Sequence, residues 1–199
     1  MYSSIDDLEC VKYQDNFIQT DFNVYKRILS EVTFNSDEES SIYMYGKKIN
    51  IPRKQVAFGE AGTFYRFSGV KVTPRPFEES KTISVVLDVL KKKLGIDFNF
   101  VLVNYYQDGS KHIGYHSDDE ADLSPNYPIA SLSFGQERPF RLRHKVTGKT
   151  HEIILKNNSC ICMYPPCQKI YKHSVPKTAK KIEGRINLTF RRIQITYSK

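Results

Sequence analysis

Tryptophan is absent from this chain, and cysteine, methionine and long apolar runs are scarce. No apolar run approaches the roughly 20 residues that a membrane-spanning helix requires, and the acidic N-terminus lacks the basic and apolar regions of a secretion signal. These absences predict a soluble intracellular protein without membrane partners. The cysteine spacing fits neither a disulfide framework nor a C-x-x-C motif, so we expect reduced thiols, with a structural zinc site as the alternative. The four cysteines are Cys10, Cys160, Cys162 and Cys167.

Acidic residues are also fewer than basic ones. Lysine and arginine number 30 against 22 aspartates and glutamates, and a net charge of +8 favours a polyanionic partner such as nucleic acid. A chain of 199 residues with 40% hydrophobic content can bury one substantial core. We expect one domain, with an N-terminal extension over residues 1–97 and a core over residues 98–199. No heptad pattern is left over, so we expect a monomer.

Two amphipathic helices are predicted before the core. The first follows Asp21 as its N-cap, and the second begins after Ser80 and ends at Gly95, with lysines in its last turn. The apolar faces comprise Phe22, Tyr25, Leu29 and Val32 in the first helix, and Ile83, Val86, Leu87, Leu90 and Leu94 in the second.

Strand patterns fill most of the chain from residue 98 onward, and Asp-Gly and Thr-Gly pairs supply turns between them. Many short strands after two helices predict a mainly β fold with flanking helices, arranged as a double-stranded β-helix, or jelly roll. The predicted strands span residues 98–106, 113–117, 129–134, 139–144, 152–155, 160–164 and 186–195.

Three residues predict a metal site. His116 and Asp118 are two residues apart, so in an extended strand both side chains point to one side. His173 is available as the third ligand. Two histidines and one carboxylate form the facial triad of non-haem Fe(II) oxygenases, which leaves positions open for a cosubstrate and O2.

A second polar pattern lies near the C-terminus. If residues 185–191 form a strand, four polar side chains share one face and three apolar ones share the other. A wholly polar inward row requires an anionic or polar occupant. The polar row is Arg185, Asn187, Thr189 and Arg191, and the apolar row is Ile186, Leu188 and Phe190.

These motifs together resemble the AlkB family of Fe(II)/2-oxoglutarate nucleic-acid demethylases. The resemblance rests on NYYQDG at residues 104–109, HIGYHSDDE at 112–120, PIASLSFG at 128–135 and RINLTFR at 185–191. It continues upstream through PRKQ at 52–55 and FSG at 67–69, and covers roughly residues 42–195. Within the family the chain is most similar to the homologue that repairs double-stranded DNA.

The resemblance implies oxidative demethylation of N1-methyladenine and N3-methylcytosine in DNA. This reaction is direct-reversal repair that releases formaldehyde and succinate, and it implies residence in the nucleus. His116, Asp118 and His173 would hold Fe(II). The 2-oxoglutarate carboxylates would contact Arg185 and Arg191, because a guanidinium binds a carboxylate bidentately. Asn104 and Tyr106 would contribute from a neighbouring strand, and Asn187 and Thr189 from the polar row.

The resemblance also implies a pocket for a flipped base, formed by the N-terminal extension as a nucleotide-recognition segment. Tyr65 and Phe67 would stack on the base from one side; buried core aromatics are the alternative. Asp119 and Glu120 would favour the cationic methylated bases over their neutral parents; a solvated acidic loop is the alternative. Arg53 would contact backbone phosphates beside the hydrophobic finger described next.

A last segment indicates whether the DNA substrate is single- or double-stranded. By resemblance, Met44, Tyr45 and Gly46 form a hydrophobic finger that wedges into the gap left by the flipped base, which favours duplex DNA. Packing of Tyr45 into the core is the alternative. The turn at residues 145–149 is shorter than the basic loop of the duplex-acting relative, which argues against duplex preference.

Three other functions remain open at this point. One is a demethylase of RNA or single-stranded DNA, which needs no wedge. Another is a non-catalytic protein of the same fold that binds damaged nucleic acid, and the third is a protein hydroxylase.

Overall fold

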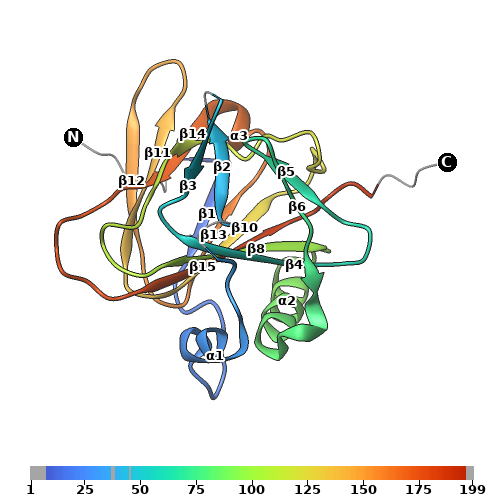
Figure 1. Cartoon of the computed structure of the whole chain (residues 1–199). Helices are drawn as coiled ribbons and strands as arrows, with labels where there is room; N and C mark the ends of the chain where they lie inside the picture. The colour runs from blue at the N-terminus through green and yellow to red at the C-terminus, as the bar shows by residue number, and fades with distance from the viewer. Residues whose placement is uncertain (1–7, 37–38, 45, 196–199) are drawn as a thin grey trace.

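Two β-sheets enclose a cavity, and helices cover the outer side of the larger sheet (Figure 1). This computed structural model describes residues 8–36, 39–44 and 46–195, with only the backbone for residues 43 and 44. The arrangement is the jelly roll with flanking helices that the sequence predicts. Within these ranges, no helix is long and apolar enough to cross a membrane.

The larger sheet has seven strands in the order β1-β13-β10-β15-β8-β4-β7. Its neighbours pair antiparallel, except that β4 and β7 run parallel. Strand β15 lies in the middle, between β10 and β8. The strands are β1 (Val11–Gln14), β4 (Lys54–Gly59), β7 (Arg75–Pro76), β8 (Phe100–Tyr106), β10 (Ile129–Gly135), β13 (Ser159–Met163) and β15 (Arg185–Arg191).

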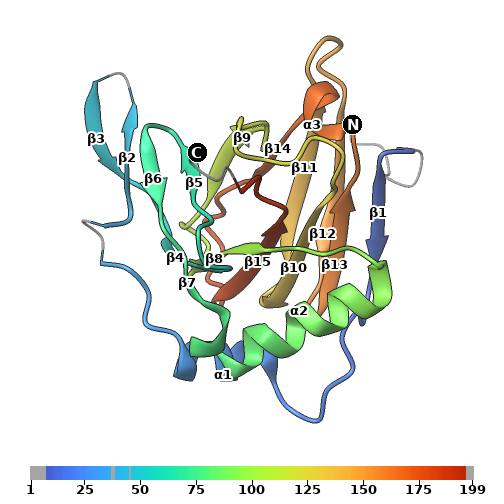
Figure 2. The ribbon, with the colours of Figure 1, turned by 90° about the vertical axis from the view of Figure 1, so that its right-hand side faces the viewer.

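The smaller sheet has four strands in the order β12-β11-β14-β9. Two hairpins, β2–β3 and β5–β6, stand next to each other at one edge of the molecule (Figure 2). The strands are β9 (Ile113–His116), β11 (Arg138–His144), β12 (Thr150–Leu155), β14 (Tyr171–Val175), β2 (Ser41–Met44), β3 (Lys47–Asn50), β5 (Tyr65–Phe67) and β6 (Val70–Val72).

The main core lies between the larger sheet and two helices. Ile28 of α1 (Val24–Glu31) and Ile83 and Leu90 of α2 (Lys81–Leu94) are fully buried against the sheet. Figure 2 shows both helices beneath the sheet, on the side away from the cavity. A second apolar cluster, which includes Leu142 and Ile161, fills the space between the two sheets. Two short helical turns, η1 (Phe77–Glu79) and α3 (Cys167–Ile170), complete the chain.

The prediction for α2 is confirmed and that for the start of α1 is wrong. Ser80 caps α2, and Gly95 ends it with a left-handed φ of 66°. In contrast, α1 begins after Asn23, whose side chain accepts a hydrogen bond from the Lys26 N–H. The predicted face of α1 was counted from Phe22, which precedes the helix, so its phase was shifted and Leu29 is 37% exposed.

The predicted strands are confirmed with changed ends. Strand β15 stops at Arg191 instead of 195, and beyond it Ile193 forms an isolated bridge with Leu123. Strand β14 was missed, because the pattern YKHSV has no apolar run to reveal it. Residues before 98 contribute β1, β4 and β7 to the larger sheet.

The cap of α2 depends on two side chains. The Ser80 hydroxyl accepts a hydrogen bond from the Ile83 N–H and donates to Glu31 Oε2 at 2.9 Å. Because Ser80 is buried, we expect Ser80→Ala to lower the free energy of unfolding by about 1–2 kcal/mol, measured by urea denaturation. Ser30→Ala, which removes an exposed hydroxyl from α1, is the matched control and should change it little.

Glu31 links α1 to the start of α2. Burial tends to raise the pKa of Glu31, but hydrogen bonds from Thr82 and Ser80 lower it overall below its usual 4.5. A lowered pKa in the folded state stabilises the fold above pH 4.5, and this contribution is lost as the pH falls further. We therefore expect Glu31→Gln to be less stable at pH 7 and to lose less stability on acidification. Chemical denaturation at a series of pH values measures this, and a pH profile of Glu31→Gln equal to that of the native protein would contradict it.

Candidate active site

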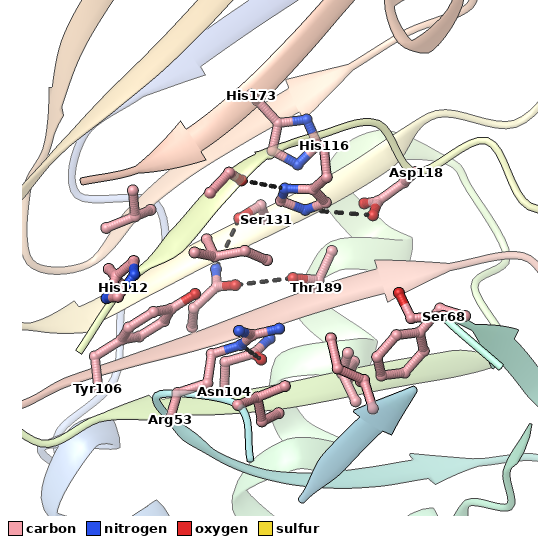
Figure 3. Close-up of a pocket in the computed structure, with 18 of the residues that line it drawn as sticks. Arg53, Ser68, Asn104, Tyr106, His112, His116, Asp118, Ser131, His173 and Thr189 are labelled. Carbon is pink, nitrogen blue, oxygen red and sulfur yellow. Dashed lines mark hydrogen bonds and ion pairs between the residues drawn. The ribbon is translucent and has the colours of Figure 1, made fainter. Parts of the chain in front are cut away.

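A cavity of about 390 Å3 opens between the two sheets. Strands β8 and β15 of the larger sheet and β9 and β14 of the smaller one line it, and the hairpins β2–β3 and β5–β6 contribute its rim. Side chains from several of these elements converge on it (Figure 3). The lining combines polar side chains from the strands with apolar and aromatic ones from the hairpins.

Three side chains converge at one end of this cavity. His116 and His173 are direct partners on β9 and β14, with ring centroids 4.2 Å apart. Asp118 follows β9, and its Oδ1 lies 3.8 Å from His116 Nε2. One ligand atom from each residue lies within 4.8 Å of the others. Figure 3 shows the three side chains next to one another. The three residues predicted as metal ligands are therefore brought together.

The protonation states at this cluster suit a metal ion. Burial lowers the pKa of His116, and burial together with the neighbouring His116 lowers that of His173 to about 3. Burial alone would raise the pKa of Asp118, but Arg191 and the two imidazoles lower it to about 2. At neutral pH both imidazoles are neutral and the carboxylate is ionised, which are the forms that bind metals.

The cluster is held in place by neighbouring groups. His116 Nδ1 lies 2.9 Å from the Gly114 carbonyl, and a hydrogen bond donated there leaves Nε2 free for a ligand. Arg191 Nη2 donates to Asp118 Oδ2 at 2.9 Å. His173 Nδ1 is buried and has no hydrogen-bond partner among the described residues. A buried nitrogen without a hydrogen-bond partner, close to the potential ligand atoms of His116 and Asp118, fits a site that binds a metal ion.

A buried arginine lies on the same strand as Arg191. Arg185 is 1% exposed, and its Nη2 donates to Ser133 Oγ at 2.8 Å. Its Nε and Nη1 are buried without a hydrogen-bond partner in the described part of the chain. The Tyr106 ring lies 5.2 Å from its guanidinium carbon. Burial lowers the pKa of Arg185 to about 10, so it stays cationic at neutral pH and requires an anion.

The wall between these groups is a polar network. Asn104 and Asn187 are direct partners on β8 and β15. Thr189 Oγ1 donates to Asn187 Oδ1 at 2.8 Å, and Asn104 Oδ1 accepts from Arg53 Nε at 2.9 Å. The polar row predicted for β15 thus faces the cavity, while its apolar row packs in the core between the larger sheet and the helices. Arg53, which the sequence predicts to contact a backbone phosphate of the nucleic acid, lies in the cavity wall.

The rim carries the aromatic and acidic residues. Tyr65 and Phe67 share one side of β5, with ring centroids 5.4 Å apart, but Tyr65 is 1% exposed and packs against Phe100 as a core residue does. Glu120 lines the cavity. Asp119 does not; its carboxylate is exposed and lies 3.5 Å from Lys145 Nζ, so the structure does not bring it to the cavity.

Comparison with known proteins identifies the family. Residues 18–191 match the 2OG-Fe(II) oxygenase superfamily. The DNA oxidative demethylase ALKBH2 of Mus musculus is 40% identical over 178 residues, which are 85% of this chain and 74% of the relative. The human ALKBH2 is 37% identical over 181 residues, 87% of this chain and 69% of the relative. The chain belongs to the AlkB family of Fe(II)/2-oxoglutarate-dependent dioxygenases.

Two further comparisons agree with this assignment. The Rattus norvegicus protein named alpha-ketoglutarate-dependent dioxygenase alkB homolog 3 is 32% identical over 151 residues, 71% of this chain and 50% of the relative. A solved structure, OsALKBH1, superposes with a TM-score of 0.59 at 20% identity and covers 92% of this chain and 98% of that one. This likeness confirms the fold predicted for an AlkB oxygenase.

The cofactors of an AlkB oxygenase fit the residues present. The family uses Fe(II), 2-oxoglutarate and O2, and the cluster of two neutral imidazoles and one carboxylate is a suitable iron site. The unpartnered guanidinium nitrogens of Arg185 fit an organic anion such as 2-oxoglutarate.

The predicted AlkB finger falls at the turn between β2 and β3. Tyr45 lies outside the described residues, and for Met44 only the backbone is described. Gly46 has a φ of 73°, which favours glycine at this turn. Ile42 and Ile49 of the hairpin line the cavity, so the hairpin adjoins the site.

Several supporting residues were not predicted from the sequence. Gln168 of α3 accepts a hydrogen bond from the Asp118 N–H at 3.0 Å, and Phe140 stacks on His173. Arg138 is buried, and its Nη2 donates to the Lys111 and Pro176 carbonyls. Only the PFRLRH strand pattern could have signalled Phe140 as an inward residue; no sequence signal marks the others.

We expect Arg185→Lys to weaken 2-oxoglutarate binding by roughly 10- to 100-fold, because an ammonium cannot reproduce two parallel N–H bonds to a carboxylate. Isothermal titration of the metal-loaded protein measures this. Arg192→Lys is the matched control, since Arg192 lies just beyond the same strand and pairs with Asp97 at the surface. Equal 2-oxoglutarate affinity in Arg185→Lys and the native protein would show that this arginine does not hold the cosubstrate.

Proposed function

We propose that this protein is a DNA oxidative demethylase that removes methyl groups from N1-methyladenine and N3-methylcytosine, which is direct-reversal DNA repair. The observation that carries the proposal is one cavity that joins the His116, Asp118 and His173 cluster to an unpaired buried arginine and an aromatic rim. The names of the Mus musculus and human relatives support DNA as the substrate.

Each group in the cavity has a role in this proposal. His116, Asp118 and His173 hold Fe(II), which with 2-oxoglutarate and O2 supplies the oxidation of the N-methyl carbon and leads to formaldehyde and succinate. Arg185, beside Tyr106, holds one carboxylate of 2-oxoglutarate. Asn104, Asn187 and Thr189 line the space between, and Arg191 orients Asp118 through their ion pair and faces the other carboxylate.

The rim supplies recognition of the base, and residues 1–97 contain the nucleotide-recognition segment. Phe67, which is partly exposed, stacks on the flipped base, and Tyr65 supports it from beneath. Burial raises the pKa of Glu120, and a cationic methylated base beside it would favour the ionised form. Glu120 therefore favours the lesion over the neutral parent base. Asp119 lies outside the cavity beside Lys145 and does not share this role.

Duplex DNA is the substrate that we favour. The β2–β3 hairpin stands at the cavity rim, where Met44, Tyr45 and Gly46 form a finger that fills the gap left by the flipped base. Such a substrate places the protein in the nucleus, where it acts as a monomer.

Single-stranded DNA or RNA is a second candidate substrate. The turn between β11 and β12 spans only residues 145–149 and offers little surface for the undamaged strand. Under this alternative, the finger contributes nothing to turnover, and Tyr45→Ala leaves activity on both kinds of strand intact.

The test is formaldehyde release from matched single- and double-stranded oligonucleotides that carry N1-methyladenine, with mass spectrometry of the base. We expect repair of both, faster on the duplex, and a loss of more than roughly 100-fold in Asp118→Ala, since changes outside the ligand shell alone cost metal sites 10- to 100-fold. Asp88→Ala on the exposed side of α2 is the control. No repair of either strand by protein that binds 2-oxoglutarate would overturn the substrate assignment.

A further inference from the structure

The outer face of the smaller sheet carries an exposed aromatic side chain beside the cavity. Within the described residues, strand β9 is an edge strand of this sheet, since it pairs there with β14 alone, and it borders the cavity. His116 and His173 point inward to the metal cluster, so their strand neighbours Tyr115 and Lys172 point outward. Tyr115 is 38% exposed. An aromatic ring therefore sits on the outside of the rim.

Two cations accompany this ring. Arg143 on β11 is the direct partner of Lys172 on β14, which places both on the outer face. The Arg143 guanidinium carbon lies 5.3 Å from the centroid of the Tyr115 ring, close enough for a cation–π contact. Tyr115, Lys172 and Arg143 thus form a continuous outer patch across three strands, which we call the rim patch.

The charges of the rim patch are uncompensated. Arg143 and Lys172 are exposed, and neither forms an ion pair with an acidic side chain among the described residues. Arg141, next but one to Arg143, differs in that its Nε pairs with Glu152 at 2.7 Å. An exposed pair of unpaired cations beside an aromatic ring is complementary to a phosphate backbone with an unstacked base.

We propose that the rim patch binds the damaged strand next to the flipped nucleotide, with one neighbouring base stacked on Tyr115 and its phosphates held by Arg143 and Lys172. The inference rests on the proposed function and names a further contact of the same site. Tyr115 is next to His116 on a strand that borders the cavity, so its ring lies within reach of the nucleotide adjacent to the flipped one. Stacking on an aromatic ring accepts any base, so the patch adds affinity without sequence preference.

The test compares oligonucleotide and single-nucleotide substrates. We expect Tyr115→Ala to reduce the advantage in KM of a methylated octanucleotide over the methylated mononucleotide by roughly 5- to 150-fold, which is the effect of losing one stacked base. Tyr115→Phe keeps the ring and should retain the advantage. Tyr127→Ala is the matched aromatic control, because Tyr127 is 42% exposed and does not line the cavity.

A binding measurement separates this inference from the proposed function. Fluorescence anisotropy with an undamaged single-stranded DNA octanucleotide needs no turnover. Arg143→Ala and Lys172→Ala should each lower the slope of log affinity against log salt by about 0.7, whereas the exposed Lys92→Ala on α2 should not. Unchanged slopes together with an unchanged oligonucleotide advantage in Tyr115→Ala would overturn the rim patch. Changed slopes without demethylation would keep the patch and overturn the proposed function.

Discussion

The structure depends on the alternation of side chains along β15. This strand is buried on both faces, so one row must suit the apolar core and the other must suit the cavity. Leu188 and its apolar neighbours pack against the helices, and Arg185 and Arg191 face the cavity on the other side of the sheet. A shift of one residue in its pairing with β8 or β10 would put arginines into the core. The register of β15 against β8 and β10 is therefore fixed by the same residues that form the site.

The buried charges of the site favour binding over stability. Arg191 and Asp118 compensate each other at 2.9 Å, although both were removed from water to do so. Arg185 donates a hydrogen bond to Ser133, but its Nε and Nη1 are buried without a hydrogen-bond partner among the described residues. A cation buried in this way is stabilised when an organic anion occupies the cavity, so the cosubstrate should also stabilise the fold by mass action.

Two levels of recognition can be distinguished around the cavity. The metal cluster and β15 carry the features shared with the AlkB family. The rim carries further contacts, such as the Arg143 guanidinium beside Tyr115 and the pair of hydrogen bonds that Arg66 on the β5–β6 hairpin donates to Asp122. The second contact connects the β5–β6 hairpin to the segment that follows Asp118.

The sequence alone determined the jelly roll, helix α2, the shared side of His116 and Asp118 and the polar row of β15, because each rests on a local period or spacing. His173 was joined to His116 and Asp118 only through the resemblance to the AlkB family. Tertiary structure decided the rest. Strand β14 exists because β11 and β9 pair with it on either side, and no local pattern revealed it. The burial of Tyr65, the inward place of Arg53 and the contact of Asp119 with Lys145 depend on segments distant in sequence. Spacing along the sequence shows which side of a strand a residue occupies, but only the packing of distant segments decides which groups that side contacts.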